Sequence, residues 1–468
     1  MTVSFYKKTV AACKDTQLSQ KLTAALETQI NSRLRVSGEL GDVEKYKKLG
    51  ADVRDDVLAN LDTHLAKFVE MATAAGVNVH WALDAAQART IITDIAKQNG
   101  VERIVKSKSM ITEEIELNHA LEAENIEVTE TDLGEFIIQV ADQKPSHIVL
   151  PAIHLSRKDV ADIFKDKIGY TNGDEPSILT KAAREHLRQK FKNAQMGISG
   201  VNFAIADQGL WTTCTNEGNA RYVMTWPDIY VGVMGIERIV KDTDSAAVIL
   251  KLLARFATGQ RITQYTNFSK GPCTDDGPKQ VHIVLLDNGR SRILAGKFRK
   301  MLRCIRCGAC LNVCPVFRCI GGQNFPGSYS GPMGTVLLPL FKGFEATGKL
   351  PNACSVCGRC TETCPVKIPL HDYILDLRYE RSKTKHRDWL EKFGMGVIAW
   401  AMSHPFIYRF GHRFAHLGLW FFTGQDGWVK WLPSIPGKWT KVKDLPLPAK
   451  KSYYASIKDK KQPEDSNG

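Results

Sequence analysis

Two cysteine-rich stretches with almost the same spacing constrain this chain more than any other feature. The first reads Cys304-x2-Cys307-x2-Cys310-x3-Cys314-Pro315, and the second reads Cys354-x2-Cys357-x2-Cys360-x3-Cys364-Pro365. This is the spacing of bacterial ferredoxins that carry two [4Fe–4S] clusters. A tight loop places three thiolates on three corners of one cube, and the fourth cysteine, on the following helix, reaches the other cube. The sequence therefore predicts an electron-transfer module.

We expect each cluster to take three ligands from one repeat and its fourth ligand from the other repeat. The predicted ligands of the first cluster are Cys304, Cys307, Cys310 and Cys364, and those of the second are Cys354, Cys357, Cys360 and Cys314. Gly308 and Gly358 would let the backbone approach the clusters closely. A four-thiolate zinc site is the alternative, but it would use one quartet and not two symmetric ones. Cys319 is left over, and we expect it to be a bystander thiol rather than an exchangeable ligand.

Length and composition limit the remaining possibilities. The chain has 468 residues, which favours two or three domains, and 43% hydrophobic and 24% charged residues, which is ordinary for a globular protein. The first residues have no apolar core of signal-peptide length, and the most apolar run, from Phe393, is too short to span a bilayer. We therefore expect a cytoplasmic protein, in which clustered cysteines indicate metal or cluster ligands rather than disulfides. The net charge of +13 permits an acidic partner, an anionic ligand or an anionic membrane surface without choosing among them.

Periodicity divides the chain into four parts. Residues 1–65 show helical apolar spacing in "QLSQKLTAALETQINSRLRV", and a second helical run, "DDVLANLDTHLAKFVEMATAAG", ends at a glycine. Residues 66–290 alternate short strand-like runs ("RIVKS", "IEVTETD", "HIVLPA", "VHIVLLD") with helical runs ("TEEIELNHALEAEN", "ILTKAAREHLRQKFKNAQ", "SAAVILKLLARFATG"). This alternation predicts an α/β sheet with covering helices. "VNFAIADQGLWTTCT" and "RYVMTWPDIYVGVMG" are predicted to add strands with a turn between them. Residues 291–380 form the two-cluster module.

Residues 381–468 differ in composition from the rest. Six of the nine tryptophans lie there, and the final dozen residues are predicted to be a disordered tail. We expect "WAMSHPFIYRFGHRFAHLGLWFF" to form a helix pair that packs over the cluster module. The alternative is a peripheral surface that contacts a membrane or a quinone at the inner face of the membrane, since aromatic and cationic side chains suit that interface. Nothing else in the sequence supports binding of nucleic acid.

Two stretches of the α/β domain are candidates for a ligand pocket. In "VKSKSMITEE", residues Lys106, Lys108, Ser109 and Thr112 would form an anion-binding corner at a helix N-terminus, or else a capping loop with Thr112 as the N-cap. In "TNEGNAR", residues Glu217, Asn219 and Arg221 would line a pocket, or else belong to a hairpin turn. Both alternatives stay open for both stretches. The catalytic residues, if there are any, are unknown, although Glu113 or Glu217 could serve as a carboxylate nucleophile.

No nucleotide-binding fingerprint is visible. "GFEATGKL" has the spacing of a phosphate-binding loop, but Leu350 stands where that loop needs Ser or Thr, and the stretch lies between the cysteine repeats. The sequence also has no G-x-G-x-x-G pattern. A flavin or nicotinamide, if the chemistry of this protein needs one, is therefore expected elsewhere.

Several long motifs resemble a known family. "KSKSMITEEIELNHALE", "SGVNFAIADQGLWTTCTNEGNAR", "MGIERIV", the cysteine block with "CPVFR" followed by two glycines, and "KWTKVKDLPLPAKKS" resemble the lactate utilisation protein B family over about residues 20 to 455. The α/β part looks like the LUD domain, whose fold is similar to sugar-phosphate isomerases and CoA-transferases. Some members carry Ser at the position of Cys354, whereas both quartets are complete here.

The resemblance implies a function that the residues alone do not reach. It implies an iron–sulfur electron-transfer subunit of a complex that oxidises L-lactate to pyruvate, with two [4Fe–4S] clusters as its cofactors. The implied partners are a cysteine-rich subunit similar to heterodisulfide reductase and a smaller LUD protein. Whether the chain is itself an enzyme stays open. The alternative is a ligand-binding or acyl-transfer enzyme of the CoA-transferase-like fold with redox-sensing clusters.

Overall fold

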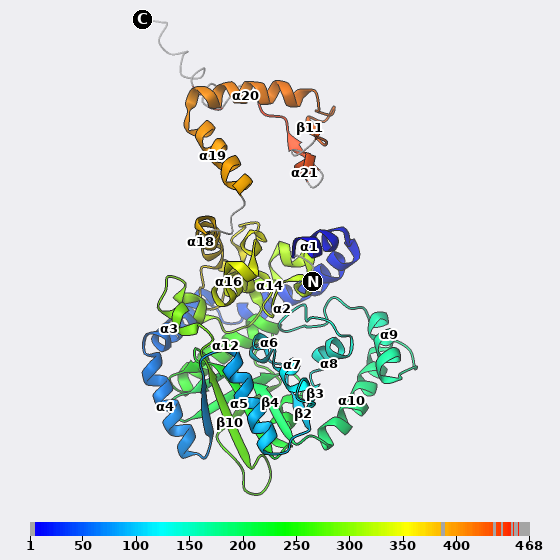
Figure 1. Cartoon of the computed structure of the whole chain (residues 1–468), viewed down its shortest axis with the longest axis vertical. Coiled ribbons are helices and arrows are strands. Elements are labelled where there is room, and N and C mark those ends of the chain that lie inside the picture. Colours follow the sequence, from blue (N-terminus) through cyan, green and yellow to red (C-terminus); the bar gives the residue numbers. More distant parts are fainter. Residues whose placement is uncertain are drawn as a thin grey trace, which may run out of the picture. The chain divides into compact units, whose positions relative to one another are not determined.

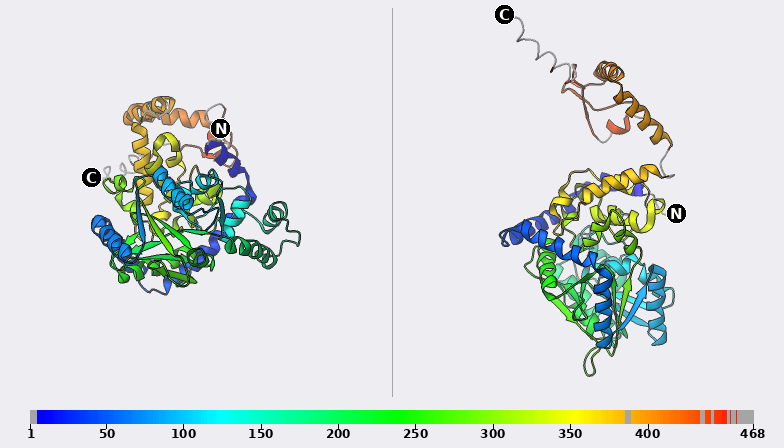
Figure 2. Two further views of the ribbon diagram at one scale, coloured as in Figure 1. Left: turned by 60° about the horizontal axis from the view of Figure 1, so that its bottom comes forward. Right: turned by 90° about the vertical axis from the view of Figure 1, so that its left-hand side faces the viewer.

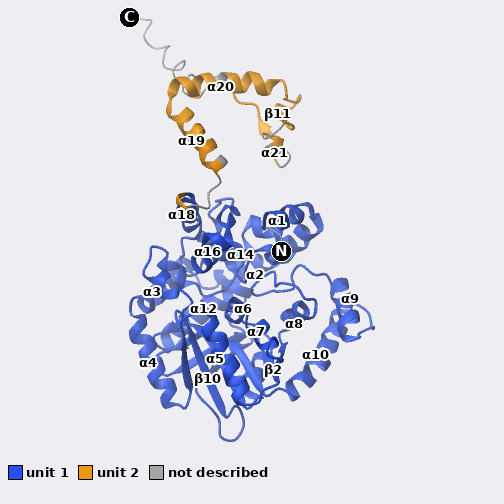
Figure 3. Ribbon diagram, in the orientation of Figure 1, with its two compact units in different colours: residues 1–382 blue, residues 383–468 orange. Residues whose placement is uncertain are grey.

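The structure, a computed structural model, describes residues 5–384, 389–433, 437–440, 443–450, 453 and 457. It divides the chain into two compact units, Met1–Ser382 and Lys383–Gly468 (Figure 3). The first unit holds the N-terminal helices, the α/β domain and the cysteine module together. The tail that the sequence predicts to be disordered lies outside the described residues.

Six parallel strands form the main sheet of the first unit (Figure 1). Their order across the sheet is β1 (Asn78–Ala82), β10 (Gln280–Leu286), β7 (Ile229–Gly235), β4 (Met196–Gly200), β2 (Arg103–Lys106) and β3 (Glu127–Glu130). From β2 the chain moves outward to β3, whereas from β4 it moves the other way to β7 and β10. The sheet therefore has a topological switch point between β2 and β4, and ligands of open α/β sheets bind at the carboxyl ends of strands at such a point.

Helices cover both faces of this sheet because successive side chains of each strand point to opposite faces. On β10, Ile283 and Leu285 share a core with α4 (Leu61–Ala74), whereas Val284 and Leu286 share a core with α5 (Ala85–Gln98). Figure 2 shows the sheet between these helical layers. The strands predicted from "RIVKS", "IEVTETD" and "VHIVLLD" correspond to β2, β3 and β10.

A second, smaller sheet lies beside the first. Its order is β8 (Ile239–Val240), β5 (Phe203–Ile205), β6 (Leu210–Thr215) and β9 (Tyr265–Ser269). β5 and β6 pair antiparallel around a turn with Gly209 at positive φ, as "VNFAIADQGLWTTCT" predicts.

One stretch that is predicted to form a strand does so only in its second part. The first part of "RYVMTWPDIYVGVMG" belongs to helix α11 (Asn219–Thr225), and only the second part forms β7. The helix lies directly against β4, where a Cβ on Gly197 would stand 1.9 Å from the carbonyl oxygen of Val223. This close approach requires glycine on the strand, so tertiary packing overrides the β-branched and aromatic composition of the segment.

The stretch "HIVLPA" is predicted as a strand but forms a loop. The amides of Val149 and Leu150 both donate to His147 Nδ1 at 3.1 Å, and the amide of Ser146 donates to the carbonyl of Pro151. The loop satisfies its own backbone and packs its apolar side chains toward the cysteine module, so it needs no neighbouring strand.

Helical runs are confirmed, although two of them are interrupted. The run from residue 55 to 76 is divided at Asn60 between α3 (Val43–Ala59) and α4. The run "TEEIELNHALEAEN" is divided at Glu116, which has a positive φ of 54°, between α6 (Met110–Glu114) and α7 (Leu117–Glu122). α10 (Pro176–Lys192) and α12 (Thr243–Thr258) lie where they are predicted.

The N-terminal helices α1 (Phe5–Lys14) and α2 (Thr16–Gly38) are part of the core of the first unit. Leu18, Leu22 and Leu26 of α2 are buried in one cluster with residues of α12 and of the cysteine module. That module contains η1 (Arg299–Arg303), α14 (Ala309–Asn312), α15 (Pro315–Ile320), η2 (Gly322–Asn324), α16 (Gly331–Thr347), η3 (Leu350–Asn352), α17 (Arg359–Thr363) and α18 (Leu370–Lys383).

The second unit contains the helices α19 (Trp389–Ser403) and α20 (Pro405–Trp420) and a short pair of strands, β11 (Trp428–Val429) and β12 (Leu445–Pro446). Large apolar side chains of both helices are exposed, among them Trp389, Phe393, Trp400, Phe406 and Phe410. None of the helices that the structure describes has the length and apolarity needed to cross a bilayer.

Candidate functional site

The two cysteine loops have the same backbone conformation. Arg306 and Val356 occupy equivalent positions after the first cysteine of each repeat, with φ of 59° and 56°. Gly308 and Gly358 follow with φ of 77° and 78°, and each begins a short helix. Left-handed conformations at non-glycine residues cost of order 1–3 kcal/mol each and mark segments held for a purpose. The duplication in sequence is therefore also a duplication in structure.

The thiols form two groups that cross the repeats. Burial raises the pKa of Cys310, and so do the nearby Cys304, Cys307, Cys360 and Cys364. Burial raises the pKa of Cys314 to about 11, and its cysteine neighbours are Cys354 and Cys357 of the other repeat. Each fourth cysteine thus lies near the first cysteines of the opposite loop, and the two groups adjoin where α14 packs against α17.

The donor set fits iron–sulfur clusters. Backbone amides point at sulfur atoms, from Phe317 to Cys314 Sγ at 3.5 Å, from Val356 to Cys354 Sγ at 3.3 Å and from Ile368 to Cys364 Sγ at 3.4 Å. Such N–H groups stabilise thiolates that ligate iron. The described cysteines are all free thiols, and in the part of the chain that the structure describes no three His, Cys, Asp or Glu side chains converge on one position for a single metal ion.

The two groups differ in their surroundings. In the first, Cys307 and Cys364 are buried, and Cys304 Sγ lies 3.6 Å from Met333 Sδ. In the second, Cys357 is exposed to solvent, and so is the neighbouring Val356. The first group therefore faces the interior of the unit, and the second group reaches its surface.

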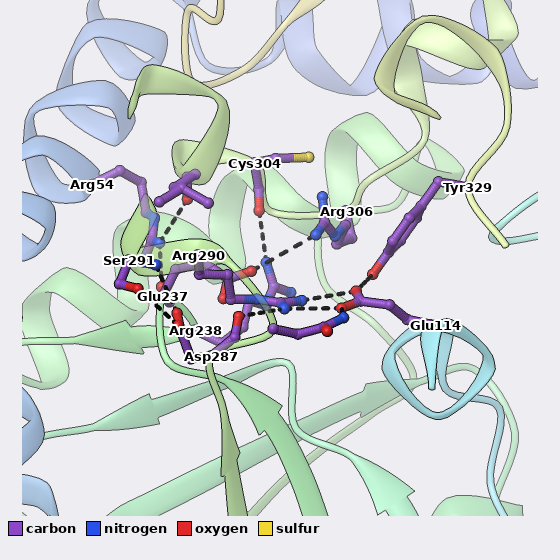
Figure 4. A network of polar contacts seen from close by, with 12 residues as sticks. Arg54, Glu114, Glu237, Arg238, Asp287, Arg290, Ser291, Cys304, Arg306 and Tyr329 are labelled. Carbon is purple, nitrogen blue, oxygen red and sulfur yellow. Dashed lines mark hydrogen bonds and ion pairs between the residues drawn. The ribbon is translucent and has the colours of Figure 1, made fainter. Parts of the chain in front are cut away.

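A network of buried arginines joins the first cysteine loop to the α/β domain (Figure 4). Arg290 donates to Glu114 at 2.8 and 2.9 Å and to Glu237 at 2.6 Å. Arg238 donates to the carbonyl oxygen of Cys304 at 2.7 Å, and Arg306 lies 3.7 Å from Glu237. With Arg54, which donates to three backbone carbonyls, the network holds four arginines and three acidic residues, Glu114, Glu237 and Asp287. The first cysteine loop therefore lies in a positively charged environment.

A cavity of about 570 Å³ lies at the carboxyl ends of β2, β4 and β7. Loops that follow β2 and β4 form one wall, the apolar loop 148–153 and helix α12 form others, and Arg238, Arg290, Arg306 and Tyr329 line the end next to the first cysteine loop. It is therefore located at the switch point of the sheet, where ligands of open α/β folds bind.

Ionisable groups along this cavity are strongly perturbed. Lys108 Nζ is buried without a hydrogen bond, and Glu135 Oε1 lies 3.9 Å away from it. Burial raises the pKa of Glu135 to about 8. Burial and the nearby Asp132 raise the pKa of Glu217 to about 7. Near neutral pH, Glu135 is therefore mostly uncharged, although it lies beside the buried Lys108 side chain.

The structure brings together three of the seven predicted pocket residues. Lys108, Ser109 and Glu217 line the cavity. Lys106 does not, because its ammonium is fully buried between Glu130 at 2.6 Å and Glu113 at 3.1 Å, and it also donates to Thr112. Burial alone would lower the pKa of Lys106, but these two carboxylates raise it.

The other predicted pocket residues have structural partners. Asn219 is buried and donates to Thr131, and Arg221 bonds to Asn267 and stacks on Tyr265. The N-cap of α6 is Ser109 and not Thr112, since the Ser109 hydroxyl accepts from the Thr112 amide. "TNEGNAR" is no hairpin turn, because it connects β6 to α11.

Sequence reasoning missed the arginine network as part of the site. A signal was present, because Glu237 and Arg238 directly follow the buried strand β7, and charged residues at the carboxyl end of a central strand face the ligand-binding edge. Arg306 lies between Cys304 and Cys307, at a position whose residue type the cysteine spacing does not specify. Glu114 and Tyr329 lie too far apart in the sequence to be paired by inspection.

Comparisons with protein-family models match most of the chain from residue 65 onward. Residues 65–286 match the LUD domain, residues 300–368 match a 4Fe-4S dicluster domain, and residues 378–462 match the C-terminal domain of lactate utilisation protein B.

Curated proteins match over the same length. Lactate utilization protein B of Bacillus cytotoxicus is 42% identical over 453 residues, which cover 96% of this chain and 95% of the relative. The proteins of the same name from Bacillus thuringiensis and Bacillus anthracis are 41% identical with the same coverage. Among solved structures, a DUF162 family protein from Deinococcus radiodurans is 12% identical and covers 48% of this chain with a TM-score of 0.28.

Proposed function

Because this chain belongs to the lactate utilization protein B family, we propose that it is the iron–sulfur electron-transfer subunit of a complex that oxidises L-lactate to pyruvate. The relatives carry lactate utilization in their name, and a 4Fe-4S dicluster domain matches the cysteine module. The single observation that carries the proposal is that thiols of the two repeats lie near one another, Cys364 near Cys310 and Cys354 near Cys314.

The first set, Cys304, Cys307, Cys310 and Cys364, would hold one [4Fe–4S] cluster. The second set, Cys354, Cys357, Cys360 and Cys314, would hold the other. A bound cluster of this type supplies one-electron transfer. The protein's own contribution is to hold the two sets side by side, with Cys307 and Cys364 of the first set buried and Cys357 of the second set exposed.

The asymmetry of the two loops supports a direction for the path. The first loop adjoins the cavity of the α/β domain, and the second reaches solvent at Cys357. We propose that electrons pass between the cavity side and a partner that approaches the second loop. The proposed partners are a cysteine-rich subunit similar to heterodisulfide reductase and a smaller LUD protein.

We further propose that residues 66–290 share the fold of sugar-phosphate isomerases and CoA-transferases, and that Lys108, Ser109 and Glu217 belong to their ligand pocket. Division at residues 65, 290 and 380 into functional parts is part of the same proposal. An acyl-transfer enzyme is not favoured, since Glu113, one candidate nucleophile, forms an ion pair with Lys106.

The second unit supports a proposal about location. α19 and α20 expose many aromatic side chains, and from Pro365 onward 18 lysines and arginines stand against 10 acidic residues. Aromatic and basic side chains together favour the interface of an anionic bilayer. We propose peripheral attachment to the inner face of a cytoplasmic membrane. Sedimentation with anionic vesicles tests it, and α19 and α20 variants with Trp389, Trp400 and Phe406 changed to Ser should lose this binding.

The function is tested by reduction of the clusters. The protein is purified without oxygen, assembled with the two partner subunits, and titrated with L-lactate while EPR follows the clusters. Reduction by lactate in the assembled complex, but not in the isolated chain, is the expected result. Failure of lactate to reduce clusters that dithionite reduces would overturn the proposed role in lactate oxidation.

A further inference from the structure

The cavity next to the first cysteine loop has no role in holding the clusters. Its lining includes residues of the loop after β2, residues of α12, and Arg306 and Tyr329, together with the polar Asn216 and Glu217. Arg306 lies between two predicted cluster ligands in the sequence and also lines the cavity. The cavity and the first cysteine loop therefore have Arg306 in common.

The proposed reaction creates a need for such a molecule. Oxidation of lactate to pyruvate removes two electrons and two protons from one carbon–oxygen unit, whereas a [4Fe–4S] cluster of this type takes up one electron at a time. The complex therefore needs an organic carrier that accepts two electrons together and releases them singly. This step of the argument rests on the proposed function.

The size of the cavity favours an anionic ligand that is larger than lactate or pyruvate. A volume of about 570 Å³ lies within the range of about 300–1,000 Å³ that cofactor sites occupy. Lactate and pyruvate are far smaller and would leave most of this space empty. A tricyclic ring with a short phosphorylated chain would fill it.

The lining matches an apolar body with an anionic end. The apolar part of the lining comes from two segments, Ile148, Val149, Leu150 and Ile153 of the loop and Leu253, Ala254 and Ala257 of α12. Lys108 contributes a buried ammonium that makes no hydrogen bond, so its donors are available to a ligand. Arg306 contributes a guanidinium whose only ion-pair partner, among the residues that the structure describes, is Glu237 at 3.7 Å. Ammonium and guanidinium groups are the usual receptors for phosphate and carboxylate.

We infer that this cavity binds a flavin-type cofactor with one phosphate group, with the ring system between the loop 148–153 and α12 and the phosphate near Lys108. This site replaces the sequence-based expectation that a flavin is held elsewhere. No G-x-G-x-x-G loop is needed, because side-chain cations and the ends of the strands take its place.

The inference is tested by binding of flavin mononucleotide to the full-length, cluster-loaded chain. Quenching of flavin fluorescence gives the dissociation constant for the wild type and for three variants. Lys108→Gln removes the buried ammonium, and Ala257→Phe fills the apolar part of the cavity. Lys181→Gln is the matched control, because Lys181 also lies 3.9 Å from a glutamate, Glu185, but on the exposed surface of α10.

Saturable binding by the wild type is expected, with affinity lowered about tenfold by Lys108→Gln, as for loss of one charge-assisted contact. Ala257→Phe should weaken it at least as much, and Lys181→Gln should leave it within twofold. Equal iron content in all four proteins shows that the variants fold. No binding by the wild type, or equal binding by all variants, would overturn the inference, and so would binding of lactate without binding of the flavin. The proposed electron-transfer role fails separately, in the lactate titration of the assembled complex.

Discussion

At the scale of single residues, the buried arginines are the feature that most affects the chemistry of the clusters. Four thiolates around a cube make an anion, and reduction adds a further negative charge. Among the residues that the structure describes, Arg54, Arg238 and Arg306 share Glu237 as their nearby carboxylate. They should therefore stabilise the reduced state of the first cluster relative to the oxidised state.

Arg306→Gln is predicted to lower the midpoint potential of the cluster next to Cys304. The expected shift is on the order of tens of millivolts, since about 1.4 kcal/mol corresponds to about 59 mV for one electron. An EPR-monitored redox titration measures it. Arg378→Gln is the matched variant for the second cluster, because Arg378 donates to the carbonyl oxygen of Cys354 at 2.7 Å. If both variants shift the midpoint potential of the same EPR signal, or if neither shifts any, the assignment of the two arginines to different clusters is wrong.

Glu135 predicts a dependence of stability on pH. Burial raises its pKa from an ordinary value of 4.5 to about 8 in the folded chain. Between these values the folded state holds a proton that the unfolded state has lost, so stability falls as the pH rises, by at most about 1.4 kcal/mol per pH unit. Glu135→Gln should flatten the decline of the melting temperature between pH 5 and pH 8. A variant that melts with the same pH dependence as the wild type would contradict the raised pKa.

Functional residues could be predicted only where a cofactor requires a fixed spacing of its ligands in the sequence. The eight cysteines follow from a fixed ligand spacing, but the pocket did not, since only Lys108, Ser109 and Glu217 of its predicted members line the cavity. Lys106 was misjudged because its partner Glu130 lies on another strand. A sequence shows that a lysine is near a helix start, but not that a carboxylate from elsewhere already neutralises it.

At the scale of elements, glycines show how the cysteine module is joined to the α/β domain. The amide of Gly322 in η2 donates to Ser146 Oγ at 3.0 Å, and a Cβ on Gly322 would stand 1.6 Å from the Ser146 carbonyl oxygen. His147 continues the contact, with Nε2 at 2.9 Å from Asn312 Oδ1. The loop 146–153 thus has two roles. Residues 148–153 line the cavity, and Ser146 and His147 bind the cysteine module.

Gly322→Ala is predicted to weaken the contact between the cysteine module and the loop 146–153. The added methyl group cannot fit against backbone, so we expect a loss of several kcal/mol in the free energy of unfolding and a lower iron content. Differential scanning calorimetry and iron analysis measure both effects. Gly38→Ala in α2 is the control, because a Cβ there meets nothing within 4 Å. Equal melting temperatures for the two variants would refute the close contact.

Most elements could be predicted, and the exceptions have one physical cause. Apolar runs became strands where they reached the sheet, as in β2, β3 and β10. The run "HIVLPA" is just as apolar, but its burial comes from the cysteine module, and its backbone is satisfied by His147. Local patterns show that a segment will be buried, but not which part of the molecule will bury it.

At the scale of the whole molecule, the first unit connects a cavity to the surface through two adjoining thiol groups. The sequence indicated the module and, by resemblance, the family. It did not indicate that the ligand edge of the sheet faces the first cysteine loop, because that arrangement depends on contacts between segments far apart in the chain. The N-terminal helices, predicted as a separate segment, contribute to the core under the module.

The central claim is that two clusters share their ligands across the repeats, and iron content in two double variants tests it most directly. If ligation is crossed, Cys304 and Cys364 serve the same cluster, whereas Cys304 and Cys314 serve different ones. Anaerobically purified wild type should contain about eight iron per chain, Cys304→Ala/Cys364→Ala about four, and Cys304→Ala/Cys314→Ala close to none. The reverse order of the two double variants would show that each repeat holds its own cluster, and would contradict the account.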